Sequence, residues 1–142
     1  MAAEPLLRDL GTEAMRLGRR RTSTYPGSLL EDSAFRILHT LEESGPLSLA
    51  DLSHELQLER STVSRQVSAA VGTGLVERYA APGGRSRWVR ATTAGREAYW
   101  HDGRLRAAVW SAAIEEFGSD RAERFLADLR DFNDAVDRAH AR

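Results

Sequence analysis

The sequence predicts a mainly α-helical protein with one short β-hairpin, and three observations support this fold class. Apolar residues recur at helical spacing in several separate segments of the 142-residue chain. Glycine and proline stand between those segments, where helices are expected to end. One stretch, residues 75–91, contains instead two strand-like runs on either side of a glycine-rich tip. The length allows one domain, and a composition of 42% apolar and 29% charged residues is that of an ordinary globular protein.

Two helices are expected in the first third of the chain. The first covers residues 4–20, and a loop with Tyr25, Pro26 and Gly27 follows it. The second covers residues 30–43, with Phe35, Ile37, Leu38 and Leu41 as its apolar set, and it ends at the run Ser44, Gly45 and Pro46.

A pair of short helices joined by a tight turn is expected at residues 48–74. Ser48 begins the first helix, with Asp51 at the place of a capping box, and residues 57–59 form the turn. On the second helix, Val63 and Val67 face the core. The opposite face is small, hydroxylated and cationic, and consists of Ser61, Thr62, Arg65, Ser68 and Ala69. Such a face suits the major groove of DNA, so this pair is interpreted as a helix-turn-helix.

The hairpin that follows is interpreted as a wing. Its strands are expected at residues 75–79 and 88–91, with a glycine-rich tip at residues 80–84. Arg85 and Arg87 at this tip could enter the neighbouring minor groove, where the negative potential attracts arginine. The alternative is that both are ordinary solvated loop charges. The expected fold is therefore mainly α, a winged helix-turn-helix with a two-stranded wing.

Two further helices are expected after the wing, and they suggest a dimer. Thr92 or Thr93 caps a long helix that runs to about residue 116, and a final helix has a clear apolar stripe. A second copy of the chain would most simply bury this stripe together with the first helix, at Leu6, Leu10, Phe125, Leu129 and Phe132. The sequence thus predicts an N-terminal dimerisation helix and loop (1–30), a DNA-binding domain (31–96) and C-terminal dimerisation helices (97–142).

The distribution of charge agrees with DNA binding, although the net charge of −1 alone does not. Residues 60–96 carry seven arginines and one acid, Glu77, so their net charge is 7 − 1 = +6. Residues 97–142 carry seven arginines and ten acids, so their net charge is 7 − 10 = −3. The positive charge is concentrated around the expected helix-turn-helix and wing, as an electrostatic footprint for DNA should be.

Several functional classes have no support in the sequence. There is no cysteine, which excludes disulfides and thiol-based sensing, and the four histidines are too scattered for a metal site. No apolar run is long enough for a membrane span and no signal peptide is evident, so a cytoplasmic location is the default expectation. No nucleophile elbow or phosphate loop is present, so neither an enzyme nor a cofactor is expected.

The order of these elements resembles the MarR (multiple antibiotic resistance regulator) family of bacterial transcription factors. The most specific parts are residues 49–79 and 84–97, which include the wing end Val89, Ala91, Thr92 and Gly95. The resemblance implies that Ser61, Thr62, Ser64 and Arg65 face DNA and that Arg85 is the wing arginine. The family often has Asp where this chain has Gly83, and often has Ser at the helix cap where this chain has Glu59. The second departure leaves open whether Ser61 caps the helix instead of meeting a base.

The function expected from these features is a homodimeric, sequence-specific DNA-binding regulator, most often a repressor in this family. Its operator would be a pseudo-palindrome with half-sites roughly 10 bp apart. The resemblance also implies a small aromatic or anionic effector, for which Arg16, Tyr25, His39 and Trp100 are candidate lining residues. The alternative is a winged-helix module that contacts proteins and binds no specific DNA, which would leave the charge of residues 60–96 unexplained.

Overall fold

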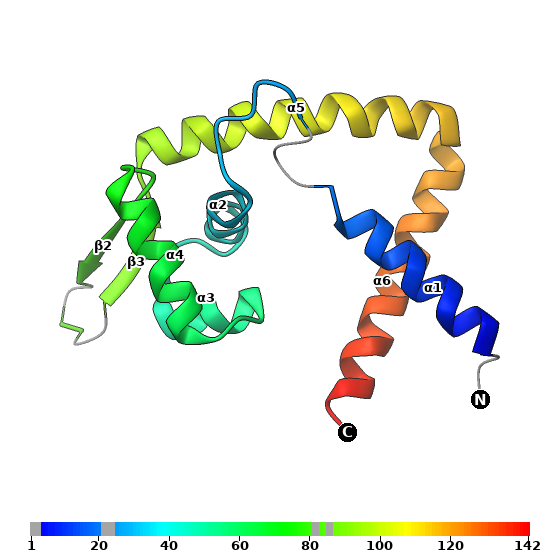
Figure 1. Cartoon of the computed structure of the whole chain (residues 1–142), viewed down its shortest axis with the longest axis horizontal. Helices are drawn as coiled ribbons and strands as arrows, with labels where there is room; N and C mark the ends of the chain where they lie inside the picture. Colours follow the sequence, from blue (N-terminus) through cyan, green and yellow to red (C-terminus); the bar gives the residue numbers. More distant parts are fainter. Residues whose placement is uncertain (1–3, 21–24, 81–82, 85–86) are drawn as a thin grey trace. The chain divides into compact units, whose positions relative to one another are not determined.

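The computed structural model of this protein describes residues 4–20, 25–80, 83–84 and 87–142. Its helices are α1 (Glu4–Gly18), α2 (Asp32–Ser44), α3 (Leu49–Leu56), α4 (Arg60–Gly72), α5 (Thr93–Phe117) and α6 (Ser119–His140), and its strands are β1 (Leu47–Ser48), β2 (Val76–Ala80) and β3 (Arg87–Ala91) (Figure 1). The mainly helical winged helix-turn-helix fold expected from the sequence is confirmed.

The chain forms two compact units, residues 1–105 and residues 106–142. The division falls within the long helix α5, so the first turns of α5 belong to the first unit and its last turns to the second. The functional division at residues 30 and 96 stays a prediction, because it depends on which segments meet DNA or a second copy of the chain.

The core of the first unit surrounds α2. Ile37, Leu38 and Leu41 line the buried side of this helix at helical spacing, and all three are at most 5% exposed. Around them lie buried side chains of α3, α4, both hairpin strands and the start of α5, namely Leu52, Val63, Val67, Ala70, Val76, Val89 and Tyr99. Each large apolar side chain buried in this way stabilises the fold by about 1.5–3 kcal/mol. The core therefore holds the helix-turn-helix and the hairpin together as one body.

The sheet has three strands, whereas the sequence predicted two. β2 and β3 form the expected antiparallel hairpin, and β1 pairs with the other edge of β3 through Leu47 opposite Val89 and Ser48 opposite Trp88. The third strand was missed because two residues are too short to show an alternating pattern. β1 leads directly into α3, so its pairing anchors the start of the helix-turn-helix to the wing.

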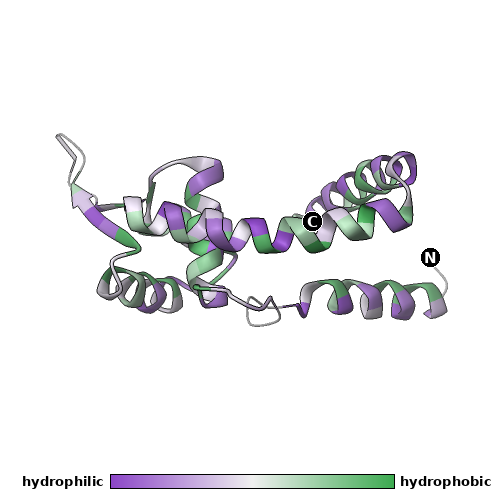
Figure 2. Cartoon of the chain, turned by 90° about the horizontal axis from the view of Figure 1, so that it is seen from above, coloured by the Kyte–Doolittle hydropathy of each residue, from purple (hydrophilic) through white to green (hydrophobic). Residues whose placement is uncertain are grey.

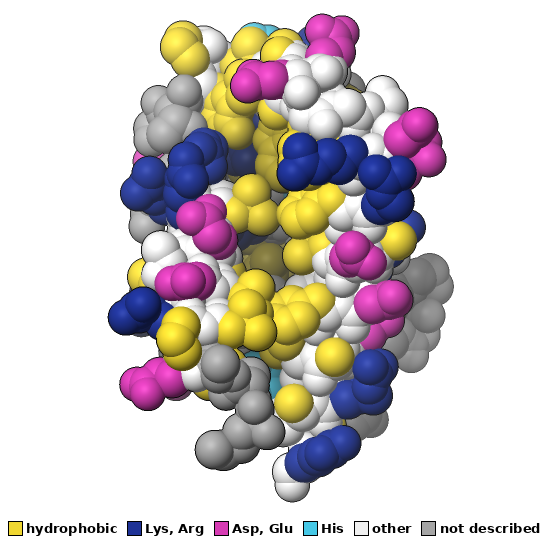
Figure 3. All heavy atoms as spheres, turned by 90° about the vertical axis from the view of Figure 1, so that its right-hand side faces the viewer, with side chains coloured by type: hydrophobic (Ala, Val, Ile, Leu, Met, Phe, Trp, Pro, Cys, Tyr) yellow, Lys and Arg dark blue, Asp and Glu magenta, His cyan; other side chains and the backbone are white. Residues whose placement is uncertain are grey.

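Helices α1 and α6 have no buried residues in this single chain. Both helices carry hydrophobic residues, drawn in green, as well as hydrophilic residues, drawn in purple (Figure 2). The surface viewed in Figure 3 carries exposed hydrophobic side chains among acidic and basic ones. The large hydrophobic side chains exposed on the two helices are Leu6, Leu7, Leu10, Met15, Leu17, Phe125, Leu126 and Phe132. No helix within the described ranges combines the length and the apolar character that crossing a lipid bilayer requires.

Candidate nucleic-acid interface

The turn between α3 and α4 sets the direction of α4. Gln57 adopts a left-handed conformation with φ 53° and ψ 43°, which ends α3 sharply. The backbone N–H of Leu58 donates to the carbonyl oxygen of Ser53 over 3.2 Å, and the Ser53 hydroxyl donates to the carbonyl oxygen of Leu58 over 2.6 Å. These bonds satisfy backbone groups that the turn would otherwise leave without partners.

One side of α4 is committed to the core. Val63, Val67 and Ala70 are at most 4% exposed, at the spacing expected for one helical face. The opposite side therefore faces away from the protein.

The predicted DNA-facing residues of α4 divide into two pairs. Ser61 and Arg65 are exposed, one helical turn apart, whereas Thr62 and Ser64 are half-buried at the borders of the exposed face. Glu59 occupies the N-cap position of α4 and makes no side-chain capping bond. Ser61 lies inside the helix and does not cap it, which resolves the alternative left open by the sequence. The structure thus brings Ser61 and Arg65 together on the outward face.

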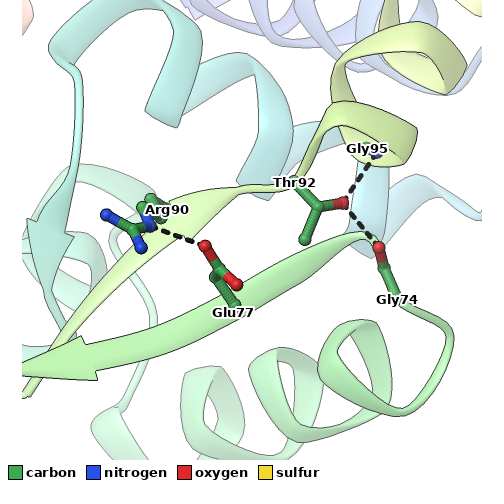
Figure 4. Close-up of polar contacts among 5 residues, drawn as sticks. All are labelled: Gly74, Glu77, Arg90, Thr92 and Gly95. Carbon is green, nitrogen blue, oxygen red and sulfur yellow. Dashed lines mark hydrogen bonds and ion pairs between the residues drawn. The ribbon is translucent and has the colours of Figure 1, made fainter.

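The hairpin beside α4 has two chemically different faces. On the outer face, Arg90 Nε donates a 2.6 Å hydrogen bond to the carboxylate of Glu77 (Figure 4), and its guanidinium lies 4.1 Å from the centre of the Tyr79 ring. The charge of Arg90 is therefore compensated within the hairpin. Among the predicted wing residues, Arg87 is exposed at the first position of β3 and Arg85 lies outside the described residues.

A contact that the sequence did not indicate joins the inner face of the hairpin to α4. Arg78 Nη2 on β2 donates a hydrogen bond of 2.8 Å to the Ser68 hydroxyl on α4. The available signal was the alternation along β2, which places Arg78 on the same side as the buried Val76. Arg78 is thus an additional cation at the outward surface of α4.

The junction between the hairpin and α5 fixes where the wing begins and ends. Thr92 donates from its hydroxyl to the carbonyl oxygen of Gly74 over 2.5 Å, and the same hydroxyl oxygen accepts the backbone N–H of Gly95 over 3.0 Å (Figure 4). Thr92 is therefore the side chain that caps α5, which confirms the expectation that Thr92 or Thr93 has this role.

The four predicted effector residues occupy different environments. Tyr25 is 6% exposed, Arg16 is exposed on α1, and the Nδ1 atom of His39 lies 2.8 Å from the hydroxyl oxygen of Tyr99. Trp100 is 51% exposed and packs edge-on against the Tyr99 ring at 5.4 Å. Tyr99 thus contacts both His39 and Trp100.

A hollow of about 690 Å³ lies elsewhere in the same unit, among residues 28–33, Arg36, Leu56, Leu58 and Gln66. None of the four predicted effector residues lines it. The geometry therefore pairs two of those residues through Tyr99 and does not join all four around this hollow.

A buried carboxylate on α5 holds the segment that leads into α2. Asp102 is 1% exposed and accepts the backbone N–H groups of Leu29 and Leu30 over 2.9 and 3.0 Å. His101 Nδ1 also lies 2.9 Å from the same carboxylate. Sequence reasoning missed Asp102 because a single acid in a charged helix resembles a solvated surface residue.

Comparison with known proteins finds a similar family for the helix-turn-helix and the hairpin. Residues 30–85, which cover α2 to the tip of the hairpin, match the model of the MarR family. The chain is 29% identical to the uncharacterized HTH-type transcriptional regulator YxaD of Bacillus subtilis over 107 residues. This match covers 75% of this chain and 75% of YxaD. Over residues 30–85 the chain is thus similar to the MarR family of winged helix-turn-helix transcriptional regulators.

Solved structures show the MarR fold over almost the full length. A mutant MarR from E. coli, complexed with operator DNA, has a TM-score of 0.73 and 19% identity, and the match covers 91% of this chain and 94% of that one. The Bordetella bronchiseptica protein BpsR, from a study of how 6-hydroxynicotinic acid regulates its DNA binding, has a TM-score of 0.67 and 19% identity, with 90% and 96% coverage. The helices outside residues 30–85 are thus part of the MarR fold.

Proposed function

We propose that this protein is a member of the MarR family and acts as a homodimeric, sequence-specific DNA-binding regulator of transcription. The observation that carries the proposal is the outward face of α4, where Ser61 and Arg65 are exposed while the apolar side of the helix is buried in the core. A helix with a solvent-facing row of hydroxyls and one arginine has the donors needed for phosphates and base edges in the major groove. DNA as the partner agrees with the cytoplasmic location expected from the sequence.

Base recognition is assigned to Arg65 and Thr62, and positioning on the backbone to Ser61, Ser64 and the wing. Arginine makes a bidentate contact to guanine, and a threonine at the border of the groove-facing surface reaches either a base or a phosphate. Arg87, exposed at the start of β3, and Arg85 supply the cations that the minor groove attracts.

Dimerisation is proposed from the unburied apolar surface of α1 and α6. Phe125, Leu126 and Phe132 on α6 are 46–50% exposed, and Leu6 and Leu10 on α1 are 44–53% exposed. A contiguous apolar stripe exposed on a helix normally marks an interaction surface. A second copy is the occupant we propose, because two-fold symmetry would present two α4 helices to successive major grooves.

Release of DNA by a small effector is the regulatory part of the proposal. BpsR, whose fold this chain shares, is a protein whose DNA binding 6-hydroxynicotinic acid regulates. In this chain Trp100 offers an exposed ring that packs against Tyr99, and the Tyr99 hydroxyl lies 2.8 Å from Nδ1 of His39. A small aromatic acid would stack on such a ring. The protein would release DNA if the effector-bound dimer held its two α4 helices at a spacing that does not match successive major grooves.

The competing function is a winged-helix module that contacts other proteins without specific DNA binding. It predicts weak DNA binding that salt scarcely changes. Residues 60–96 carry seven arginines and one acid, which gives a net charge of +6. The one acid, Glu77, pairs with Arg90, so the charge of the other six arginines is not balanced by an acid of this segment. This excess of positive charge favours DNA.

Selection from a random pool of duplex DNA tests the proposed function. The full chain is expected to enrich a pseudo-palindromic sequence with half-sites roughly 10 bp apart. A screen for compounds that release the selected duplex then tests the effector. If repeated rounds enrich no sequence and the remaining binding is insensitive to salt, the protein-interaction module is the better function.

A further inference from the structure

Arg78 is held beside the outward face of α4, although it belongs to the wing. Its Nη2 atom donates a 2.8 Å hydrogen bond to the hydroxyl of Ser68. Ser68 is exposed and lies one helical turn after Arg65, on the same face. A cation from β2 therefore contacts α4 one helical turn beyond the arginine assigned to base recognition.

The alternation of side chains along β2 explains the direction of Arg78. Residues two apart on a strand share a face, and Val76 is buried in the core. Arg78 also lies directly opposite Val89 on β3, which is buried as well. Arg78 is thus on the core-facing side of the hairpin, beyond the buried Val76, and its long side chain reaches Ser68 of α4.

The charge of Arg78 remains available, in contrast to that of Arg90. Arg90 lies on the other face of the hairpin, where the carboxylate of Glu77 pairs with it at 2.6 Å. Within the described parts of the chain, Arg78 contacts a neutral hydroxyl and no carboxylate lies within 4.0 Å of its guanidinium. A guanidinium has five N–H donors, and the bond to Ser68 uses one of them.

We propose that Arg78 contacts a DNA backbone phosphate and that Ser68 positions it for this contact. The inference rests on the proposed DNA-binding function. It adds to the DNA-contacting residues an arginine that lies outside both the helix-turn-helix and the tip of the wing. A phosphate is the expected partner because base contacts of a helix-turn-helix come from the N-terminal part of its second helix. Ser68 lies two turns beyond Ser61, and the planar fork of arginine matches the geometry of a phosphate.

The dependence of DNA affinity on salt distinguishes this role from a structural one. Affinity is measured at several salt concentrations for two duplexes, one selected by the wild-type chain and one of unrelated sequence. Each phosphate contact that is lost lowers the slope of log affinity against log salt by about 0.9. Arg78→Gln is therefore expected to weaken binding to both duplexes and to lower the slope by about 0.9 for each bound copy of the chain.

Three variants separate charge from positioning. Arg78→Lys keeps the charge and is expected to retain the wild-type slope. Ser68→Ala is expected to weaken binding and to retain the slope, because the cation is present but less well placed. The double variant Glu77→Gln and Arg90→Gln removes a compensated pair from the other face of the same hairpin and is expected to leave the slope unchanged.

The outcomes distinguish this inference from the proposed function. If the wild-type chain binds neither duplex, the proposed function is wrong and Arg78 has no DNA to contact. If the wild-type chain binds and Arg78→Gln retains its slope, the role of Arg78 alone is wrong. A loss of slope in the Glu77 and Arg90 double variant as large as that in Arg78→Gln would also overturn it, and an unchanged affinity in Ser68→Ala would overturn the positioning role of Ser68.

Discussion

Gly95 on α5 lies so close to Leu75 that a Cβ atom at residue 95 would be 1.9 Å from the carbonyl oxygen of Leu75. The obstacle is backbone, and that carbonyl oxygen also accepts the N–H of Thr92 over 3.1 Å. The start of α5 can therefore approach the segment between α4 and β2 only because residue 95 has no side chain.

We expect Gly95→Ala to destabilise the first unit. Overpacking a well-packed site costs about 1–3 kcal/mol, and here a backbone hydrogen bond would be displaced as well. The measurement is the free energy of unfolding by chemical denaturation at one fixed protein concentration.

Gly103→Ala is the matched control for this prediction. Gly103 lies on the same helix, and a Cβ there would meet nothing within 4 Å. Because alanine favours helix over glycine, this variant is expected to be more stable by up to about 1 kcal/mol. Equal stabilities of the two variants would contradict the close approach.

Asp102→Ala is expected to destabilise the protein by removing the acceptor for two backbone N–H groups. Leu29 and Leu30 donate to this carboxylate, and both Leu30 and Asp102 are buried. Hydrogen bonds to a charged group contribute about 1.5–3 kcal/mol each, so the loss of two should lower the free energy of unfolding by about 3–6 kcal/mol. Thermal and chemical unfolding measure this loss.

Asp51→Asn serves as the comparison, because Asp51 is exposed and uses its backbone N–H, not its carboxylate, to meet Ser48. Its effect should stay below about 1 kcal/mol, the contribution of an acid near a helix N-terminus. If Asp102→Ala lowers the free energy of unfolding by no more than this, the hydrogen bonds from Leu29 and Leu30 to Asp102 are unimportant for stability.

Arg65→Ala is expected to weaken operator binding by about 1–3 kcal/mol and to relax one operator position. The reason is the loss of a bidentate contact to a base, which a shorter side chain cannot replace. A titration of the selected duplex and of its single-base variants measures both effects.

Arg36→Ala removes an exposed arginine of α2 and provides the control for charge alone. It should change affinity little and leave the preference at every operator position intact. If Arg65→Ala binds all single-base variants with the wild-type order of affinities, Arg65 does not read a base.

Phe132→Asp is expected to shift the chain from dimer to monomer. Phe132 is 50% exposed on the apolar stripe of α6, and burial of a carboxylate in an apolar interface is unfavourable. Sedimentation at several concentrations measures the shift.

Asp134→Ala is the control, because Asp134 lies on the opposite side of α6 by helical spacing, and it should leave the association unchanged. A wild-type chain that is monomeric at all concentrations would contradict the proposed dimer.

Local sequence patterns were enough to predict the type of every long element. The apolar residues Val63, Val67 and Ala70 recur at helical spacing on α4, and Gly74 follows the helix, so both the helix and its buried side could be inferred. Ser48 and Thr92 were recognisable as caps because the bonds that they make reach only three residues along the chain. Such features depend on neighbours in sequence, and the sequence alone determined them, together with the outward face that carries Arg65.

Contacts between residues distant in sequence were decided by the tertiary structure. Arg78 and Arg90 are both arginines of the same hairpin, yet pleating places one beside Ser68 of α4 and the other on Glu77. Asp102 meets residues more than 70 positions earlier, and β1 exists only because β3 offers it an open edge. The sequence determined that residues 60–96 are cationic, whereas folding decided which of those charges are compensated, because compensation depends on which side chains the packed core brings within reach.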